Sequence, residues 1–406
     1  MDIRKYGPYC LVGQAGFPPG SVPVPSFTAP LVILKQADPL WNRCLYPIHS
    51  LAEVEQESTL ALLPPVSAVE SPLEAFVREN GAAVLNTAFP DCWRLLELQQ
   101  KSKLCGLRVT LVGLGDVGGA VLTGLILLGK EIEQISIYDP NQTVCQRYAF
   151  EMNQILPVDG RQPPHVRVCP LDALFDCDLF LFAASRGVPP LGSAGDVRMA
   201  QYQANRSLAA HYAKLARKAG FSGLFCQISD PVDHLCRAVF LESNRSDDGK
   251  LDFLGLLPEQ IQGFGLGVMA ARAAYCADEL GLPRENLRVY GPHGTGLIAA
   301  NAPLTEYDDV LSRTLSEQTR DMNLRIRDLG FKPYLAPALS SAVLSILQLV
   351  RGQSHYGAVP LGGVYFGCKS RMTRYGIQPQ QEPLAPILQT RIQTAFQALQ
   401  EFAYES

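Results

Sequence analysis

The sequence predicts an α/β protein whose centre is a doubly wound parallel sheet. From Leu107 onward, short apolar segments alternate with helical stretches, and this alternation is typical of such a sheet. A glycine-rich turn separates the first of these apolar segments from the first helical stretch. The chain has 406 residues, of which 47% are hydrophobic and 18% charged, so it is neither disordered nor short enough to form one ordinary core.

The first hundred residues have a different composition from the rest. Residues 1–104 hold 12 of the 30 prolines and both tryptophans. Because proline fixes φ and removes a hydrogen-bond donor, residues 16–30 are expected to be extended or turning. The apolar segment 31–35 predicts a strand, and 71–80 and 91–100 predict helices. We expect an appended small domain or wrapping arm, with no catalytic role indicated.

The alternating region supplies the elements of the parallel sheet. Short segments rich in apolar residues predict buried strands at 107–113, 134–139, 166–170, 178–185 and 223–229. Helical stretches are expected between them at about 117–129, 142–156 and 197–219. Near the end of the sequence, 384–406 has the spacing of an amphipathic helix.

Residues 109–129 could imitate a membrane span, because they carry a single charge, Asp116. Six glycines and that central aspartate favour a buried strand, a glycine turn and a buried helix instead. We therefore expect no membrane association.

Charge and cysteine usage limit the partners, metal sites and cellular location that we expect of this protein. The net charge is −4 and no basic block occurs, so nucleic acid is not an expected partner. The eleven cysteines are scattered without a CxxC pair or zinc-type spacing, which predicts free thiols and no metal. The N-terminal residues lack the apolar run of a signal peptide, so we expect a cytoplasmic location.

The glycine turn has the pattern of a dinucleotide site. Gly113, Gly115 and Gly118 form GxGxxG directly after a strand, with Asp116 and Val117 opening the helix. The three glycines allow a tight turn, close approach of a pyrophosphate and close packing of helix on strand. The helix N-terminus adds unpaired N–H groups and the positive end of a dipole.

An acidic residue stands where the ribose of such a cofactor would lie. Asp139 ends the next strand, 21 residues beyond Gly118, and no arginine follows it directly. A carboxylate there accepts from ribose hydroxyls and repels a 2′-phosphate, which favours NAD over NADP. A glycine turn that binds nothing and a methyltransferase turn remain alternatives. The favoured interpretation is a Rossmann domain that binds NAD.

Four separated segments resemble the lactate/malate dehydrogenase family, and together they cover about residues 107–400. The first, AASRGVPPLGSAGDVRMAQYQAN at 183–205, is similar to the substrate loop and the helix after it. By this resemblance Arg198 is the mobile-loop arginine that polarises the substrate carbonyl, and Arg186 approaches the cofactor pyrophosphate. The loop is about five residues longer than in most members.

The second and third segments supply the substrate-facing residues. In QISDPVDHL (227–235), Ser229 matches and is assigned to the cofactor, whereas Asp230 replaces the usual asparagine. In QGFGLGVMAARAAYCADELG (262–281), Arg272 aligns with the arginine that clamps the substrate carboxylate. The aspartate that the family carries in this helix is missing, and Val268 or Met269 occupies its place.

The fourth segment carries the proton-transfer residue. VYGPHGTGL (289–297) is similar to the GEHGD signature, and His293 matches its acid/base histidine. Histidine suits this role because its unperturbed pKa of ~6.5 lies near working pH.

The resemblance implies an NAD-dependent dehydrogenase that transfers a hydride between nicotinamide and a small 2-oxo or 2-hydroxy acid. In one interpretation Asp230 is the carboxylate partner of His293. In another, Asp230 only accepts the hydrogen bond that the oxygen of the usual asparagine accepts, and the donor of that asparagine is lost. Alternatively, exchanging an amide for an anion indicates imine reduction or amino-acid-type oxidation. A non-catalytic NAD-binding sensor is a third hypothesis.

The resemblance also implies an organisation. We expect an N-terminal part (1–104), an NAD-binding domain (105–245) and a mixed α/β substrate domain (246–406). A helix near 335–352 is expected to return to the NAD-binding domain. By analogy the protein is a homo-oligomer whose substrate is a small carboxylate.

Overall fold

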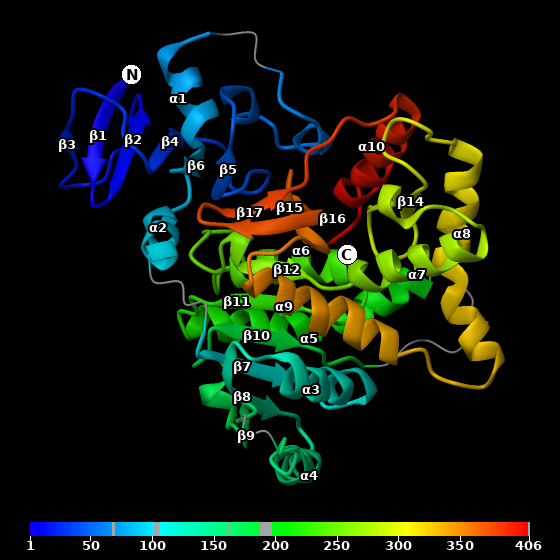
Figure 1. Cartoon of the computed structure of the whole chain (residues 1–406). Helices are drawn as coiled ribbons and strands as arrows, with labels where there is room; N and C mark the ends of the chain where they lie inside the picture. The colour runs from blue at the N-terminus through cyan, green and yellow to red at the C-terminus, as the bar shows by residue number, and fades with distance from the viewer. Residues whose placement is uncertain (67–69, 101–104, 159, 161, 187–196, 405–406) are drawn as a thin grey trace.

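The computed structural model describes residues 1–66, 70–100, 105–158, 160, 162–186 and 197–404. A nine-stranded sheet crosses the molecule, and a second, six-stranded sheet lies beside it at the N-terminal side (Figure 1). A two-stranded hairpin completes the strands that are described.

The large sheet has a doubly wound parallel half. Its strand order is β9-β8-β7-β10-β11-β12. After β7 the chain adds β8 and β9 on one side, and it then crosses over to add β10, β11 and β12 on the other side. These strands are β7 (Leu107–Val112), β8 (Ile132–Tyr138), β9 (His165–Val168), β10 (Leu179–Phe182), β11 (Leu224–Gln227) and β12 (Ile261–Gly263). The predicted fold class and the five predicted strands are confirmed.

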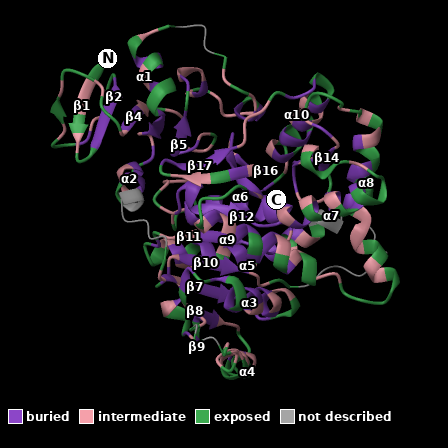
Figure 2. Cartoon of the chain, in the orientation of Figure 1, coloured by how far each residue is buried: buried purple, intermediate pink, exposed green. Residues whose placement is uncertain are grey.

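Helices cover both faces of this half because the strand side chains alternate between two apolar layers. Phe180 and Phe182 point into one layer with the helices α5 and α6, while Leu179 and Leu181 point into the other with α3. The helices are α3 (Asp116–Leu128), α4 (Gln142–Met152), α5 (Val197–Lys218) and α6 (Val232–Ser243). Figure 2 shows the strands buried between them.

The segment 109–129 is β7, the glycine turn and α3. In the part of the chain that the structure describes, no helix is long and apolar enough to cross a membrane.

The rest of the chain extends the same sheet and adds a helical layer. Three antiparallel strands, β15 to β17, continue the sheet beyond β12. The elements are α7 (Leu266–Glu279), β13 (Arg288–Tyr290), β14 (Ile298–Ala300), α8 (Asp309–Asp328), η6 (Pro337–Leu344), α9 (Ser345–Val350), β15 (His355–Leu361), β16 (Val364–Thr373), β17 (Gly376–Pro379) and α10 (Pro386–Gln400). The expected boundary at residue 245 therefore falls inside one continuous sheet, and the domain division stays a prediction.

The predicted helix near 335–352 consists of the π-helical segment η6 followed by α9. η6 packs against α3 so closely that a Cβ on Gly124 would lie 2.7 Å from Val343. The chain thus returns to the helix that follows the glycine turn.

The N-terminal region folds as an ordered sheet. Its order is β3-β1-β2-β4-β6-β5, and the predicted strand at 31–35 and the two predicted helices are confirmed. α1 begins as its Ser-Pro sequence predicts, because the Ser71 side chain accepts from Glu74 N and proline occupies the first turn. The elements are β1 (Asp2–Tyr6), β2 (Tyr9–Gly13), β3 (Val22–Pro23), β4 (Leu31–Lys35), β5 (Leu45–Ile48), β6 (Ala82–Asn86), α1 (Pro72–Asn80) and α2 (Cys92–Gln100), and short 3₁₀ turns lie at η1 (Leu51–Glu53), η2 (Thr59–Leu62), η3 (Leu171–Ala173), η4 (Pro258–Gln260) and η5 (Arg284–Asn286).

This region packs at the amino ends of the parallel strands. Its Leu11 and Leu85 share one buried apolar cluster with Phe180 of the large sheet. Arg94 of α2 donates to the carbonyl oxygen of Phe221, just before β11, at 2.6 Å. The glycine turn lies at the opposite, carboxyl ends of the strands, so the N-terminal sheet supports the fold away from that turn.

A buried carboxyl group joins the two sheets. Glu259, just before β12, accepts from Cys44 N at 2.8 Å and from Leu45 N at 3.0 Å. Burial raises the pKa of this carboxyl to about 7. The protonated form is therefore favoured in the folded protein below a pH of about 7.

We predict that Glu259→Gln removes a pH dependence of stability. The unfolded pKa of Glu is ~4.3, so the raised folded pKa contributes stability below pH ~4.3 that is lost as pH rises through about 7. The glutamine oxygen still accepts both N–H groups and never ionises. Urea unfolding at pH 5 and pH 8 should show a loss of about 1 to 3 kcal/mol in the wild type and a smaller one in the variant.

Glu259→Ala is the matched comparison. It leaves two buried N–H donors without their acceptor and should cost about 2 to 4 kcal/mol at both pH values. An equal pH dependence in Glu259→Gln and wild type would contradict the assignment to this group.

Candidate active site

The glycine turn is shaped by two close approaches. Gly113 has φ +92°, and a Cβ there would lie 2.5 Å from Ala184 N. A Cβ on Gly118 would lie 1.8 Å from the Gly113 carbonyl oxygen. Gly115 caps α3, and no described atom lies within 4 Å of the place its Cβ would take. The turn is therefore tightly packed at Gly113 and Gly118 and open at Gly115. Gly115 directly precedes the first N–H groups of α3, which have no partner within the helix.

The acidic residue of the next strand lies against this turn. Asp139 follows β8, and its Oδ2 accepts from Leu114 N at 3.0 Å. Asp116, in the first turn of α3, forms an ion pair with the exposed Lys332 at 2.9 Å. Val117 packs against the apolar layer on α3. The turn and Asp139 thus form one continuous surface, and its residues suit a nucleotide.

The carboxyl ends of β10 and β11 are tied together beside the turn. Ser229 Oγ donates to the Ala184 carbonyl oxygen at 2.6 Å. Asn205 of α5 is fully buried and bridges two chain segments: its Nδ2 donates to the Asp230 carbonyl oxygen at 2.8 Å, and its Oδ1 accepts from Arg186 N at 2.9 Å. Asn205 therefore fixes the backbone of Asp230, while the Arg186 residue is exposed.

His293 and Asp230 meet although they are 63 residues apart. His293 lies in the loop between β13 and β14, and its Nδ1 is 2.9 Å from Asp230 Oδ1. Because an ionised carboxylate only accepts, Nδ1 is the donor in this contact. The backbone N of His293 donates to Asp233 Oδ2 at 2.9 Å. The His293 side chain is 15% exposed and that of Asp230 is 44% exposed.

The neighbourhood of the histidine requires a glycine. A Cβ on Gly265, which caps α7, would lie 3.1 Å from His293 Cγ. Any larger residue at 265 would crowd the imidazole ring.

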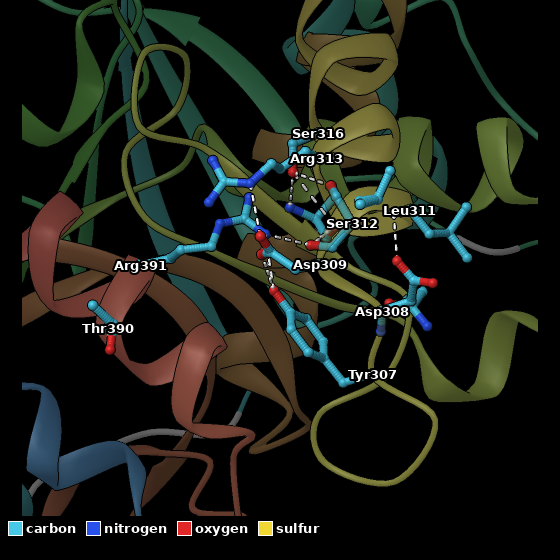
Figure 3. A network of polar contacts seen from close by, with 12 residues as sticks. Tyr307, Asp308, Asp309, Leu311, Ser312, Arg313, Ser316, Thr390 and Arg391 are labelled. Atoms are coloured by element: carbon cyan, nitrogen blue, oxygen red, sulfur yellow. Dashed lines mark hydrogen bonds and ion pairs between the residues drawn. The ribbon is translucent and has the colours of Figure 1, made fainter.

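A polar network holds the hairpin that carries His293 (Figure 3). Ser312 Oγ of α8 donates to the Ala299 carbonyl oxygen on β14 at 2.9 Å. Arg391 of α10 donates to the same Ser312 Oγ at 2.8 Å and to Asp309 at 3.0 Å. A hydrogen bond from Arg313 lowers the pKa of Asp309, which stays ionised and completes the network. The hairpin is thereby anchored to two helices.

Arg272 of α7 is a buried cation, only 8% exposed. Burial lowers its pKa, and the negative charge of Asp230 acts in the opposite direction. Within the described residues, its guanidinium forms no ion pair and contacts the Met269 sulfur at 3.9 Å. Met269 thus lies beside Arg272, whereas Val268 N donates to Ser341 Oγ at 2.8 Å.

The structure therefore brings His293, Asp230 and Arg272 to one region, and it places Asp139 against the glycine turn. Arg198 belongs to the first turn of α5, but its side chain lies outside the described residues, as does the loop 187–196 before it. The contacts of His293, Asp230 and Arg272 therefore do not test the predicted role of Arg198, which stays a prediction.

The sequence analysis assigned no role to Asn205, Asp233 or Gly265, although Asn205 and Asp233 lie in segments that resemble the dehydrogenase family. Asp233 offered a signal, because it lies three residues after Asp230 at the start of α6. The contacts of these three residues could not be predicted, since they join segments that are distant in the sequence.

Comparisons with known proteins find relatives for part of the chain. No family model matches the chain. A malate dehydrogenase of Xanthobacter autotrophicus is 26% identical over 208 residues, 50% of this chain and 58% of that protein. An L-lactate dehydrogenase 2 of Staphylococcus aureus is 25% identical over 300 residues, 68% of this chain and 88% of that protein. The matched region thus spans little more than half of the first relative.

Solved structures resemble the same part of the chain. Malate dehydrogenase from Archaeoglobus fulgidus in complex with NADH superposes with a TM-score of 0.61 at 15% identity, covering 73% of this chain and 98% of the other. The minor L-lactate dehydrogenase from Enterococcus mundtii superposes at 0.60 with 18% identity, covering 73% and 97%. The shared fold leaves about a quarter of this chain outside the match.

We predict that Arg272→Met stabilises the fold. The substitution replaces a buried charge by an apolar side chain of similar length, which should raise the free energy of unfolding by about 1 to 2 kcal/mol. Arg351→Met is the control, because Arg351 has a described partner in Glu131 at 2.7 Å. That variant should be destabilised. A loss of stability in Arg272→Met as well would contradict a net cost of burying the Arg272 charge. Thermal unfolding measures both.

Proposed function

We propose that this chain, which is similar to malate and lactate dehydrogenases, transfers a hydride between NAD(H) and a small 2-oxo or 2-hydroxy acid. The observation that carries the proposal is the His293–Asp230 contact beside a buried Arg272. An arginine that is buried without a described ionic partner is costly, and a substrate carboxylate would supply that partner.

The residues present fit a dinucleotide. The open side of Gly115 gives a phosphate access to the backbone, and the Asp139 carboxylate suits ribose hydroxyls. The negative charge of Asp139 disfavours a 2′-phosphate, which supports NAD rather than NADP. Arg186, Ser229, Asp116 and the other glycine-turn residues would line the same site.

Each side chain then has a defined task. Arg272 binds the substrate carboxylate and fixes its orientation. His293 gives a proton to the substrate oxygen during reduction and removes it during oxidation. Asp230 holds the imidazole and stabilises its protonated form. Arg198 would polarise the carbonyl. Bound NADH would supply the hydride at the carbon that carries this oxygen.

Asp230 favours a second candidate. Its carboxylate is 44% exposed at a position where the resemblance expects an uncharged amide. A carboxylate accepts hydrogen bonds from a protonated imine and repels a developing oxyanion. Imine reduction, or amino-acid-type oxidation in reverse, is therefore the alternative reaction at the same residues.

We predict that NADH oxidation followed at 340 nm will reveal turnover with a panel of 2-oxo acids. His293→Asn should lower kcat by about 10² to 10⁴, because proton transfer is lost while NADH affinity is kept. Arg272→Met should raise the KM for the acid and lower kcat. An active His293→Asn variant would contradict the proposed proton transfer.

The same panel with ammonia or a primary amine separates the candidates. Turnover only with amine present, reduced in Asp230→Asn, would establish the imine reaction. NADH binding without turnover in either panel would favour a non-catalytic sensor.

A further inference from the structure

The chain beyond α10 turns back and packs beside the candidate active site. We call Phe402, Ala403 and Tyr404 the strap. Tyr404 is 8% exposed, and its Oη donates to the Leu399 carbonyl oxygen in the last turn of α10 at 2.9 Å. The strap is thus held against its own helix while its aromatic rings enter the apolar layer of the parallel sheet.

One set of strap contacts reaches α5. The Tyr202 ring is fully buried, and its Oη donates to the Tyr404 carbonyl oxygen at 2.9 Å. The rings of Tyr202 and Phe402 meet edge to face with centroids 5.0 Å apart. Asn205 follows three residues later, on the same side of the helix, and holds the Asp230 carbonyl oxygen. The α5 contact of the strap therefore lies one turn from the residue that fixes Asp230.

A second set of contacts reaches α6. The buried His234 ring meets Phe402 edge to face at 4.3 Å between centroids. Its neighbour Asp233 accepts from the backbone N of His293. Burial raises the pKa of the Tyr404 hydroxyl, and the Asp233 carboxylate acts in the same direction, as expected of a nearby negative charge.

We propose that the strap positions the His293–Asp230 pair through these two helices. The α5 route ends at the Asp230 backbone, and the α6 route ends at the His293 backbone. The inference rests on the proposed function, because it gives the pair a catalytic role. The strap residues themselves are positioning residues, since their described contacts are with α5, α6 and α10.

The physical basis is the stiffness of a packed aromatic cluster. Interdigitated rings at interior density leave little freedom for α5 and α6 to slide past one another. A shift of about 1 Å between reacting groups can reduce a rate by about 10²-fold. Loosening the strap should therefore lower kcat more than it weakens NADH binding, because the glycine turn and Asp139, which are assigned to NADH, have no described contact with the strap.

Tyr202→Phe tests this with the smallest change. It keeps the ring contacts and removes the O–H bond to Tyr404. We expect kcat to fall about threefold to tenfold, with the NADH Kd within about twofold of wild type. Tyr9→Phe is the matched control, because Tyr9 Oη donates to the Leu96 carbonyl oxygen at 3.1 Å in the buried N-terminal sheet. It should lower Tm similarly and leave kcat unchanged.

A chain ended at Glu401 removes the strap altogether. If it folds, as judged by NADH binding, kcat should fall by about 10²-fold. If it does not fold, the comparison of Tyr202→Phe with Tyr9→Phe still tests the proposal. Equal kcat in Tyr202→Phe and Tyr9→Phe, or parallel losses of kcat and NADH affinity in Tyr202→Phe, would overturn the proposal.

A spectroscopic measurement separates this inference from the proposed function. In ¹⁵N-histidine-labelled protein, the ring resonances of His293 are assigned by their loss in His293→Asn. They should move in Tyr202→Phe and stay in place in Tyr9→Phe, whether or not a substrate has been found. A wild type without turnover on any acid or imine would contradict the proposed function alone, and an unmoved His293 resonance would contradict the strap.

Discussion

The candidate site depends on one contact between two parts of the chain, the 2.9 Å approach of His293 to Asp230. Asp230 comes from the carboxyl end of β11 in the parallel sheet, and His293 comes from a hairpin loop in the second half of the chain. Asn205 and Asp233 hold the two backbones in place. Because a carboxylate and an imidazole must meet within hydrogen-bond distance, both halves have to fold before this pair exists.

The second constraint is the charge of Arg272. Desolvation opposes a buried guanidinium, and the Asp230 carboxylate compensates only in part. Met269 gives that cation a soft apolar neighbour, because its sulfur lies 3.9 Å from the Arg272 guanidinium. The site therefore keeps a positive charge available at the cost of stability, an arrangement that suits an anionic substrate.

The N-terminal sheet has a separate place in this arrangement. It buries apolar side chains with the large sheet and receives the Glu259 carboxyl at its β5 edge. All of these contacts lie at the amino ends of the parallel strands. Asp230, Ser229 and the glycine turn lie at the carboxyl ends, where open α/β sheets bind ligands. The added region thus enlarges the core, and its Ala61 and Leu62 also pack in one buried cluster with Tyr290 and Ile298 of the hairpin that carries His293.

Much of this protein could be predicted from its sequence because the signals are local. Strand and helix positions follow from hydrophobic alternation, and the glycine turn from a six-residue pattern whose glycines are required sterically, as at Gly113 and Gly118. His293, Asp230 and Arg272 could be named from short segments. In residues 1–104 the sequence predicted only one strand of the sheet, at 31–35, and two helices. The other strands are separated by proline-rich connections, which give no local signal for strand pairing.

The sequence by itself determined the strands and helices of the parallel sheet and the candidate residues His293, Asp230 and Arg272, because these signals depend on neighbours within a few residues. Only the tertiary structure decided that Asp230 contacts His293, that Met269 lies against Arg272, and that Asn205 and the strap support the pair. These contacts join segments that are far apart in the chain. Their geometry is set by packing between layers, which no local pattern encodes.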